Sequence, residues 1–235
     1  MSSAQPKPTW PADPGCELGQ RDFDGTAFRV GRSPDPWAWT PHDFIGNGRW
    51  DDPERTYRVM YTSDQRRGAV LEKLVWLARD IEATNGVAGI GGPRRFMTNP
   101  SGVIPRQSLR ILLLGKAVLE GAFADLATDD SVHCLRDILN DQVDAAAIGS
   151  VDPRVFWNTE DTPITQMISR FIYEHSTDGD RTYAGIRSKS AQDEDVRNWN
   201  LYEGGRIIPS SSEPIDPQDR DVASAAASLG IQFIN

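Results

Sequence analysis

The stretch GNGRWDDPERTYRVMYTS, residues 46–63, with AVLEKLVW, residues 69–76, predicts a strand that leads into a helix. It carries a cation at Arg49, an aromatic hydroxyl at Tyr61 and a carboxylate at Glu72. A cation, an aromatic ring and a carboxylate on neighbouring elements suit a pocket for an anionic, ring-bearing ligand such as a nucleotide. The pattern therefore favours an enzyme.

The strand is predicted at YRVMYT, where aromatic and β-branched residues alternate with polar ones. Because side chains alternate between the two faces of a strand, Tyr57, Val59 and Tyr61 should share one face. Asp64 is placed to cap a helix over residues 65–83. The apolar stripe of that helix consists of Val70, Leu71, Leu74, Leu77, Ala78 and Ile81.

Glu72 lies at the edge of this stripe, with no lysine or arginine three or four residues away on its own helix. Arg29, in FRVGRS, adds a second arginine, and two arginines can fork onto a diphosphate. A structural interpretation is also open, in which Arg29 and Arg49 form surface ion pairs, Tyr61 is core and Glu72 is solvated. The acidic partners would then be Asp51, Asp52 or Glu54.

The rest of the chain mixes strands and helices without regular βαβ alternation, which predicts an α+β fold. Residues 85–107 carry glycines and prolines and are expected to form a long loop, serving as a lid or a partner-binding flap. Strands are expected over residues 26–30, 109–114, 182–190 and 199–202, with further strand and turn material over 117–127. Helices are expected over residues 130–140, from Thr162 and Pro163 onward, and over 217–229.

Composition is that of one globular domain, with 235 residues and an apolar fraction of 38%. The formal net charge of −9 argues against a nucleic-acid-binding surface. Cys16 and Cys134 show no metal-ligand spacing, and we expect free thiols in a reducing cytosol. The first residues lack the features of a signal peptide, and no apolar run is long enough to span a membrane. These features predict a cytoplasmic protein.

These motifs, followed by YAGIRSKS at residues 183–190 and WNLYE at 199–203, resemble the RES domain family over roughly residues 28–203. Members are typically toxins of bacterial Xre–RES toxin–antitoxin pairs that resemble ADP-ribosyltransferases and consume NAD. The resemblance implies a single compact domain over residues 25–235, with a mixed, ADP-ribosyltransferase-like sheet core and flanking helices. Residues 1–24 are expected to form a flexible N-terminal arm.

The family's functional residues map onto Glu72, Arg29 and Ser190 as catalytic groups. The resemblance implies that Glu72 faces the ribose, Arg29 and Arg49 hold the diphosphate, and Tyr61 stacks against the nicotinamide. Ser190 would hydrogen-bond the nicotinamide ribose or amide.

The alignment of the serine leaves one alternative. Family members usually have an aromatic residue two positions before the serine and a basic residue just after it, whereas this chain has Ser188 and Ala191. Ser188 is therefore a competing choice for the functional serine.

The resemblance implies NAD as substrate, no metal, a cognate Xre-type antitoxin as partner and a toxin that cleaves the nicotinamide–ribose bond. The acceptor is open between water, phosphate and a protein side chain, and a homodimer is open as well. A catalytically weak RES-like domain that binds nucleotides or proteins is the alternative function. An unrelated soluble protein that shares the pattern is a third interpretation.

Overall fold

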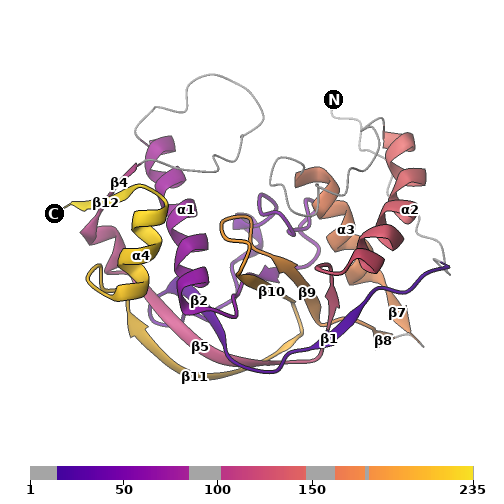
Figure 1. Ribbon diagram of the computed structural model, residues 1–235, viewed down its shortest axis with the longest axis horizontal. Helices are drawn as coiled ribbons and strands as arrows, with labels where there is room; N and C mark the ends of the chain where they lie inside the picture. Colours follow the sequence, from indigo (N-terminus) through magenta and orange to yellow (C-terminus); the bar gives the residue numbers. More distant parts are fainter. Residues whose placement is uncertain (1–14, 85–101, 147–161, 178–179, 235) are drawn as a thin grey trace.

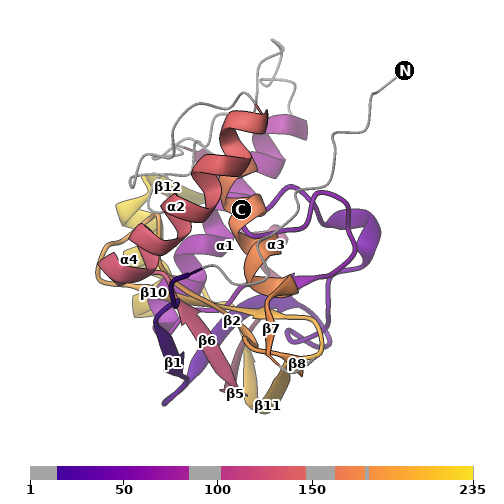
Figure 2. The same ribbon diagram turned by 90° about the vertical axis from the view of Figure 1, so that its right-hand side faces the viewer.

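The four α-helices of the described residues lie on one side of a curved layer of strands, which places the chain in the α+β class as predicted (Figure 1). A view turned by 90° shows the same separation of helices and strands (Figure 2). The computed structural model describes residues 15–84, 102–146, 162–177 and 180–234.

The helices are α1 Arg66–Thr84, α2 Asp129–Ala146, α3 Thr162–Glu174 and α4 Arg220–Ser228, with 3-10 helices η1 His42–Phe44 and η2 Arg106–Leu109. The first strands are β1 Gln20–Asp22, β2 Ala27–Arg32, β3 Val59–Met60, β4 Gly102–Pro105, β5 Leu112–Glu120 and β6 Ala122–Asp125. The later strands are β7 Ser176–Thr177, β8 Asp180–Arg181, β9 Gly185–Lys189, β10 Arg197–Tyr202, β11 Arg206–Pro214 and β12 Ile231–Ile234.

Two groups of strands make up the main sheet, in the orders β1-β6-β9-β10-β3 and β11-β5-β2. Ser63 joins them, because it exchanges backbone hydrogen bonds of 2.8 and 2.9 Å with Phe28 of β2 and also bridges Asn198 of β10. Ser63 follows Tyr61 by two residues and precedes α1 by three. We call this junction at Ser63 the seam of the sheet. It brings together Tyr61, the start of α1 and β10.

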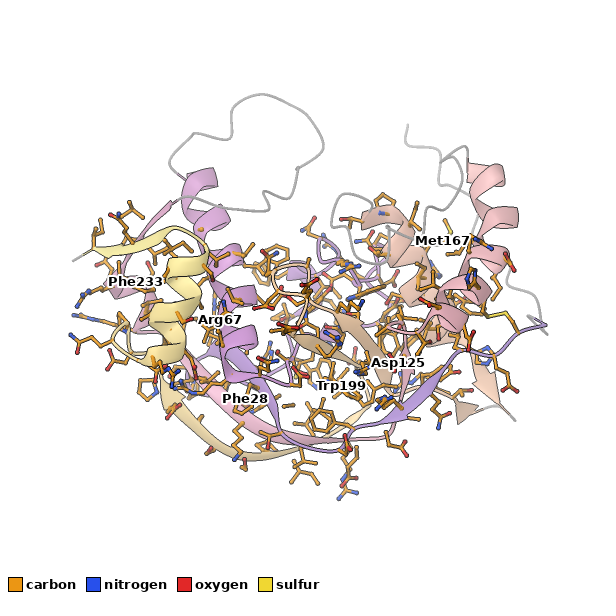
Figure 3. The ribbon with its side chains drawn as sticks, viewed as in Figure 1. Phe28, Arg67, Asp125, Met167, Trp199 and Phe233 are labelled. Carbon is orange, nitrogen blue, oxygen red and sulfur yellow. A yellow bond between two sulfur atoms is a disulfide. The ribbon has the colours of Figure 1, made fainter. Side chains whose placement is uncertain are left out.

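The apolar side chains gather in separate clusters below the two helix pairs. The cluster below α1 and α4 includes Leu71, Leu74 and Val222, and the cluster below α2 and α3 includes Leu135 and Ile168. Figure 3 shows Arg67 on α1 and Met167 on α3 at opposite sides, with Trp199 of β10 between them. The predicted stripe of α1 is buried at Val70, Leu71, Leu74 and Ala78, so the helical periodicity was correctly assigned. Glu72, on the same helix, is half-buried.

Several predicted elements differ from the observed ones. In each case a segment distant in the sequence forms the hydrogen bonds with the residues concerned. The loop predicted over residues 85–107 is wrong from residue 102 on, where β4 pairs in parallel with β12. Its first part, residues 85–101, lies outside the described residues. Asp64 accepts a hydrogen bond of 3.1 Å from the backbone N–H of Arg197 and so holds β10. Ser63 Oγ instead accepts from the N–H of Gln65, at 3.3 Å.

The two cysteines are joined in a disulfide between Cys16 and Cys134, so the expectation of free thiols is wrong. Their Cα atoms lie 5.7 Å apart although 118 positions separate them in the sequence. Within the segment expected as an arm, β1 pairs with β6 and Leu18 is buried. Residues 15–24 are therefore attached to the domain by a strand and a covalent bond.

Among the helices that the structure describes, none combines the length and apolar character needed to cross a membrane. In the same residues, no group of three or more His, Cys, Asp or Glu side chains is placed to hold a metal ion.

Candidate active site

A narrow cleft of about 50 Å³ lies at the seam of the sheet and contains three of the predicted site residues, Arg49, Tyr61 and Glu72. Helix α1 contributes Glu72, Val75 and Trp76, and β10 contributes Asn198 and Asn200. The other residues come from the segments before and after β3 and from the loop after β9. The cleft is lined by Arg49, Trp50, Tyr61, Glu72, Val75, Trp76, Ala191, Gln192, Asn198 and Asn200.

Glu72 is held by two donors that share one oxygen of its carboxylate. Ser190 Oγ and Asn198 Nδ2 each donate to Glu72 Oε1, both at 2.8 Å. Neither donor lies on α1, which agrees with the absence of a local partner in the sequence. Two hydrogen bonds from different elements fix the orientation of the carboxylate without neutralising its charge.

Arg49 projects from a short loop whose shape depends on Asp51. Asp51 Oδ2 accepts from the backbone N–H groups of Gly46 and Gly48, at 3.0 and 2.7 Å. A Cβ at Gly48 would lie 2.3 Å from the Tyr61 hydroxyl oxygen, so this position requires glycine. Gln166 of α3 also donates to the carbonyls of Gly46 and Gly48, both at 3.0 Å, which ties the loop to the helix layer.

The charge of Arg49 is set by burial and by Glu72. Burial lowers the pKa of Arg49 to about 10, while the charge of Glu72 and, less strongly, Tyr61 act in the opposite direction. Its guanidinium carbon lies 4.8 Å from the centre of the Trp50 ring. Arg49 therefore remains a cation near pH 7 and lies close enough to Glu72 for their charges to interact.

In the structural interpretation, Arg29 and Arg49 form ion pairs with nearby acidic residues. In the structure, these acidic residues contact other groups. Arg170 of α3 pairs with Glu54 at 3.1 Å and lies 4.0 Å from Asp52. Asp52 is fully buried and accepts from the backbone N–H of Thr56 at 2.6 Å.

Tyr61 lines the cleft and also braces the loop that carries Arg49. Its hydroxyl donates to Asp51 Oδ1 at 2.9 Å and accepts from the backbone N–H of Trp50 at 3.0 Å. Burial, followed by the charge of Asp51, raises the pKa of Tyr61 well above its usual range. The hydroxyl therefore stays protonated and remains a donor to Asp51.

The two candidate serines occupy different environments at the end of β9. Ser190 contacts Glu72 directly, and its Oγ also accepts from the backbone N–H of Gln192 at 3.1 Å. Ser188 is buried, and its Oγ accepts from Asn200 Nδ2 at 3.4 Å. The geometry thus joins Ser190, rather than Ser188, to the carboxylate.

Arg29 is not among the residues that line the cleft. Its guanidinium donates to the carbonyl of Pro36 and to that of Ala38, the latter at 3.3 Å. Burial lowers the pKa of Arg29 to about 10, and the nearby charge of Asp35 acts against this shift. In this structure Arg29 anchors the loop after β2.

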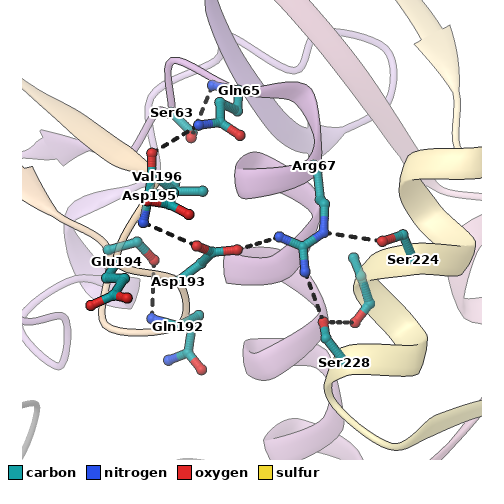
Figure 4. A network of polar contacts seen from close by, with 12 residues as sticks. Ser63, Gln65, Arg67, Gln192, Asp193, Glu194, Asp195, Val196, Ser224 and Ser228 are labelled. Carbon is teal, nitrogen blue, oxygen red and sulfur yellow. Dashed lines mark hydrogen bonds and ion pairs between the residues drawn. The ribbon is translucent and has the colours of Figure 1, made fainter.

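The loop that carries Ser190 and Gln192 is anchored to the helices by Asp193 (Figure 4). Asp193 accepts from Arg67 of α1 and, at 3.1 Å, from the backbone N–H of Asp195. Arg67 also donates to Ser224 and Ser228 of α4, both at 3.2 Å. One arginine therefore joins α1, α4 and the loop beside the cleft.

Asn198, Asn200, Gln192 and Trp76 are cleft residues that the sequence analysis did not identify. A signal was present in the alternation NWN, since two asparagines on one face of a buried strand are unusual. That signal does not say which face meets Glu72, because the pairing of β10 with β9 and Ser63 decides it.

Comparisons with known proteins agree with this fold. Among solved structures, a chain of the crystal structure of the M. tuberculosis MbcT–MbcA toxin–antitoxin complex matches with a TM-score of 0.50 and 13% sequence identity. The match covers 90% of this chain and 92% of that chain, and at this identity it supports the fold alone. No curated protein matches the sequence.

The RES domain model matches residues 26–219, a range that contains the whole cleft. Because this match extends over most of the chain, the protein belongs to the RES domain family.

Proposed function

We propose that this protein is a toxin-like enzyme that binds NAD and cleaves its nicotinamide–ribose bond in the cleft around Glu72. The observation that carries the proposal is the Glu72 carboxylate, oriented by Ser190 and Asn198 and close to the cation of Arg49. Membership of the RES family and the likeness to a chain of a toxin–antitoxin complex support it.

The chemistry requires orientation and charge stabilisation more than acid catalysis. Breaking the bond between nicotinamide and ribose passes through an oxocarbenium-like transition state, and the leaving group is already cationic. A fixed carboxylate beside the ribose stabilises the positive charge that develops there. Because two donors already hold Glu72 Oε1, the carboxylate has little to reorganise during the reaction.

The other residues act as binding groups in this proposal. Arg49 holds the diphosphate, Tyr61 lies beside the nicotinamide ring, and Ser190 orients Glu72 and the nicotinamide ribose. The family resemblance implies Arg29 as a second diphosphate ligand, but its bonds to the carbonyls of Pro36 and Ala38 leave Arg49 as the diphosphate ligand in this proposal. Water, phosphate or a protein side chain serves as acceptor, and a cytoplasmic Xre-type antitoxin silences the enzyme.

A nucleotide- or protein-binding module is the second candidate, and the small size of the cleft is the observation that speaks against NAD turnover. Ligand pockets usually measure about 300–1,000 Å³, whereas this cleft has about 50 Å³. A dinucleotide therefore fits only if the cleft widens or if the ligand extends into the open hollow of about 370 Å³ that shares Ala191 and Gln192 with the cleft. A domain that binds without turnover would not need the aligned carboxylate, which is why we place catalysis first.

The test is to incubate the purified protein with NAD and to identify the products, comparing wild type with Glu72→Gln. The substitution keeps the shape and removes the charge, so nicotinamide release should fall by roughly a hundredfold or more. NAD affinity and the melting temperature should change little, because the interaction is made mainly in the transition state.

Glu120→Gln is the matched control, since Glu120 pairs with the exposed Arg206 at the end of β5, outside the cleft. It should release nicotinamide at the wild-type rate. NAD binding by wild type without any nicotinamide release would establish the binding module instead.

A further inference from the structure

Three side-chain amide oxygens around Glu72 are buried without a hydrogen-bond partner among the described residues. They are Gln192 Oε1, Asn198 Oδ1 and Asn200 Oδ1. Within the ranges that the structure covers, the other buried side-chain nitrogen and oxygen atoms without a hydrogen-bond partner are nitrogens of tryptophan or arginine. All three oxygens belong to residues that line the cleft.

The direction of the Asn198 amide is determined by the partner of its nitrogen, and the nitrogen of Asn200 has a partner as well. Asn198 Nδ2 donates to Glu72 Oε1 at 2.8 Å, so turning the amide over would set two acceptor oxygens against each other. Asn200 Nδ2 donates to Ser188 Oγ at 3.4 Å. With each nitrogen engaged, each oxygen remains available to another donor.

The asparagines share one face of β10, because side chains alternate along a strand. Trp199, between them, packs on the other face against Phe23 and Phe123, with ring centres 4.9 and 5.1 Å apart. This packing keeps Asn198 and Asn200 on the side of Glu72. Gln192 approaches from the loop after β9, where its backbone N–H is bonded to Ser190.

Buried acceptors without partners destabilise a folded protein, so a group of them in one cleft calls for a ligand that donates hydrogen bonds. Together with the negative charge of Glu72, the three oxygens repel phosphates and attract neutral or cationic donors. The cation of Arg49 lies at the same cleft and suits the anionic end of a ligand.

We infer that Gln192, Asn198 and Asn200 form an acceptor set that selects the hydrogen-bond donors next to the scissile bond of the substrate. In NAD these donors are the carboxamide NH₂ of nicotinamide and the hydroxyls of the adjoining ribose. The inference rests on the proposed function and names specificity-determining residues for it. Asn198 has a second role, as a positioning residue for Glu72.

The test compares NAD with two analogues, one with a methyl ketone in place of the carboxamide and one lacking the 2′-hydroxyl of the nicotinamide ribose. For each dinucleotide, kcat/KM for release of the base and Kd by calorimetry are measured. Wild type should prefer NAD over at least one analogue by roughly tenfold or more, the value of one or two lost hydrogen bonds.

Asn200→Leu, which keeps the size and removes the acceptor, should abolish that preference. Asn200→Asp, which keeps an acceptor oxygen, should retain it. Gln192→Met provides a second variant at a half-buried loop position, where loss of folding is not expected, and should reduce the same preference. The analogue whose discrimination disappears identifies the recognised group.

If wild type and both apolar variants discriminate equally for both analogues, the acceptor set has no role in recognition and the inference is overturned. This result differs from failure of the proposed function, in which wild type releases no nicotinamide from NAD. In that case the ratios of Kd still decide whether the three amides recognise the ligand.

Discussion

At the scale of single residues, the two arginines of the motif differ in what surrounds them. Burial lowers the pKa of both Arg29 and Arg49 to about 10. The opposing charge is Glu72 for Arg49 and Asp35 for Arg29. Arg49 therefore belongs to the cleft, whereas Arg29 is bonded to carbonyls of the loop after β2.

We expect Arg49→Ala to weaken NAD binding by roughly tenfold or more, because a charged hydrogen bond to a diphosphate contributes about 1.5–3 kcal/mol. Arg29→Ala should mainly lower the melting temperature, since the carbonyls of Pro36 and Ala38 lose the donor that anchors the loop after β2. Calorimetry with NAD and melting curves on both variants separate the effects. Equal loss of affinity with unchanged melting of Arg29→Ala would place Arg29 among the ligand-binding groups.

At the scale of elements, α1 is joined to its surroundings by two consecutive arginines with different partners. Arg66 pairs with Glu213 of β11 and with Asp219 and Asp221 at the start of α4. Arg67 bonds to α4 as well, but it also holds Asp193 in the loop that carries Ser190. The two arginines form a matched pair that separates helix packing from loop anchoring.

Arg66→Gln and Arg67→Gln should both lower the melting temperature, whereas only Arg67→Gln should reduce nicotinamide release substantially. The reason is that Asp193 loses its anchor and the loop no longer holds Ser190 against Glu72. Release assays and melting curves on both variants provide the measurement. Equal release by the two variants would show that the loop keeps its position without Arg67.

The Arg67–Asp193 pair also predicts a dependence of stability on pH. Burial raises the pKa of Asp193, but the hydrogen bonds from Arg67 and Asp195 outweigh this and leave the pKa below its usual value. A carboxylate with a lowered pKa stabilises the fold above its unfolded pKa of about 4, and this contribution is lost as the pH falls through the folded value. The difference in melting temperature between wild type and Arg67→Gln should therefore shrink below about pH 4.

At the scale of the whole molecule, the disulfide joins the segment before β1 to α2 across 118 positions. Closing a loop of this length removes much of the freedom of the unfolded chain, which corresponds to about 4–5 kcal/mol in the chain-entropy model. Neither cysteine lines the cleft. Stability and activity should therefore respond differently to reduction.

A reductant should lower the melting temperature of the oxidised protein and leave nicotinamide release unchanged at a temperature where the reduced protein is folded. The Cys16→Ser, Cys134→Ser double variant should have the melting temperature of the reduced protein, and the reductant should not change it. Melting curves with and without dithiothreitol give the measurement. An unchanged melting temperature would mean that the bond contributes no net stability.

What the sequence determined by itself is the local structure and the inventory of chemical groups. The apolar stripe of α1 follows from a period that every turn of the helix repeats, and Tyr57, Val59 and Tyr61 follow from strand alternation. The α+β class follows from the mixture of strands and helices without regular βαβ alternation. The order of the motifs around Arg49, Glu72 and Ser190 also resembles that of the RES domain family.

Only the tertiary structure decided which of these groups meet. Ser190 and Asn198 reach Glu72 from 118 and 126 positions away, through the pairing of β9 with β10 and the bridge at Ser63. The same holds for β4 beside β12 and for Cys16 beside Cys134. Such contacts depend on strand pairing between distant segments, and local propensity carries no information about the partner.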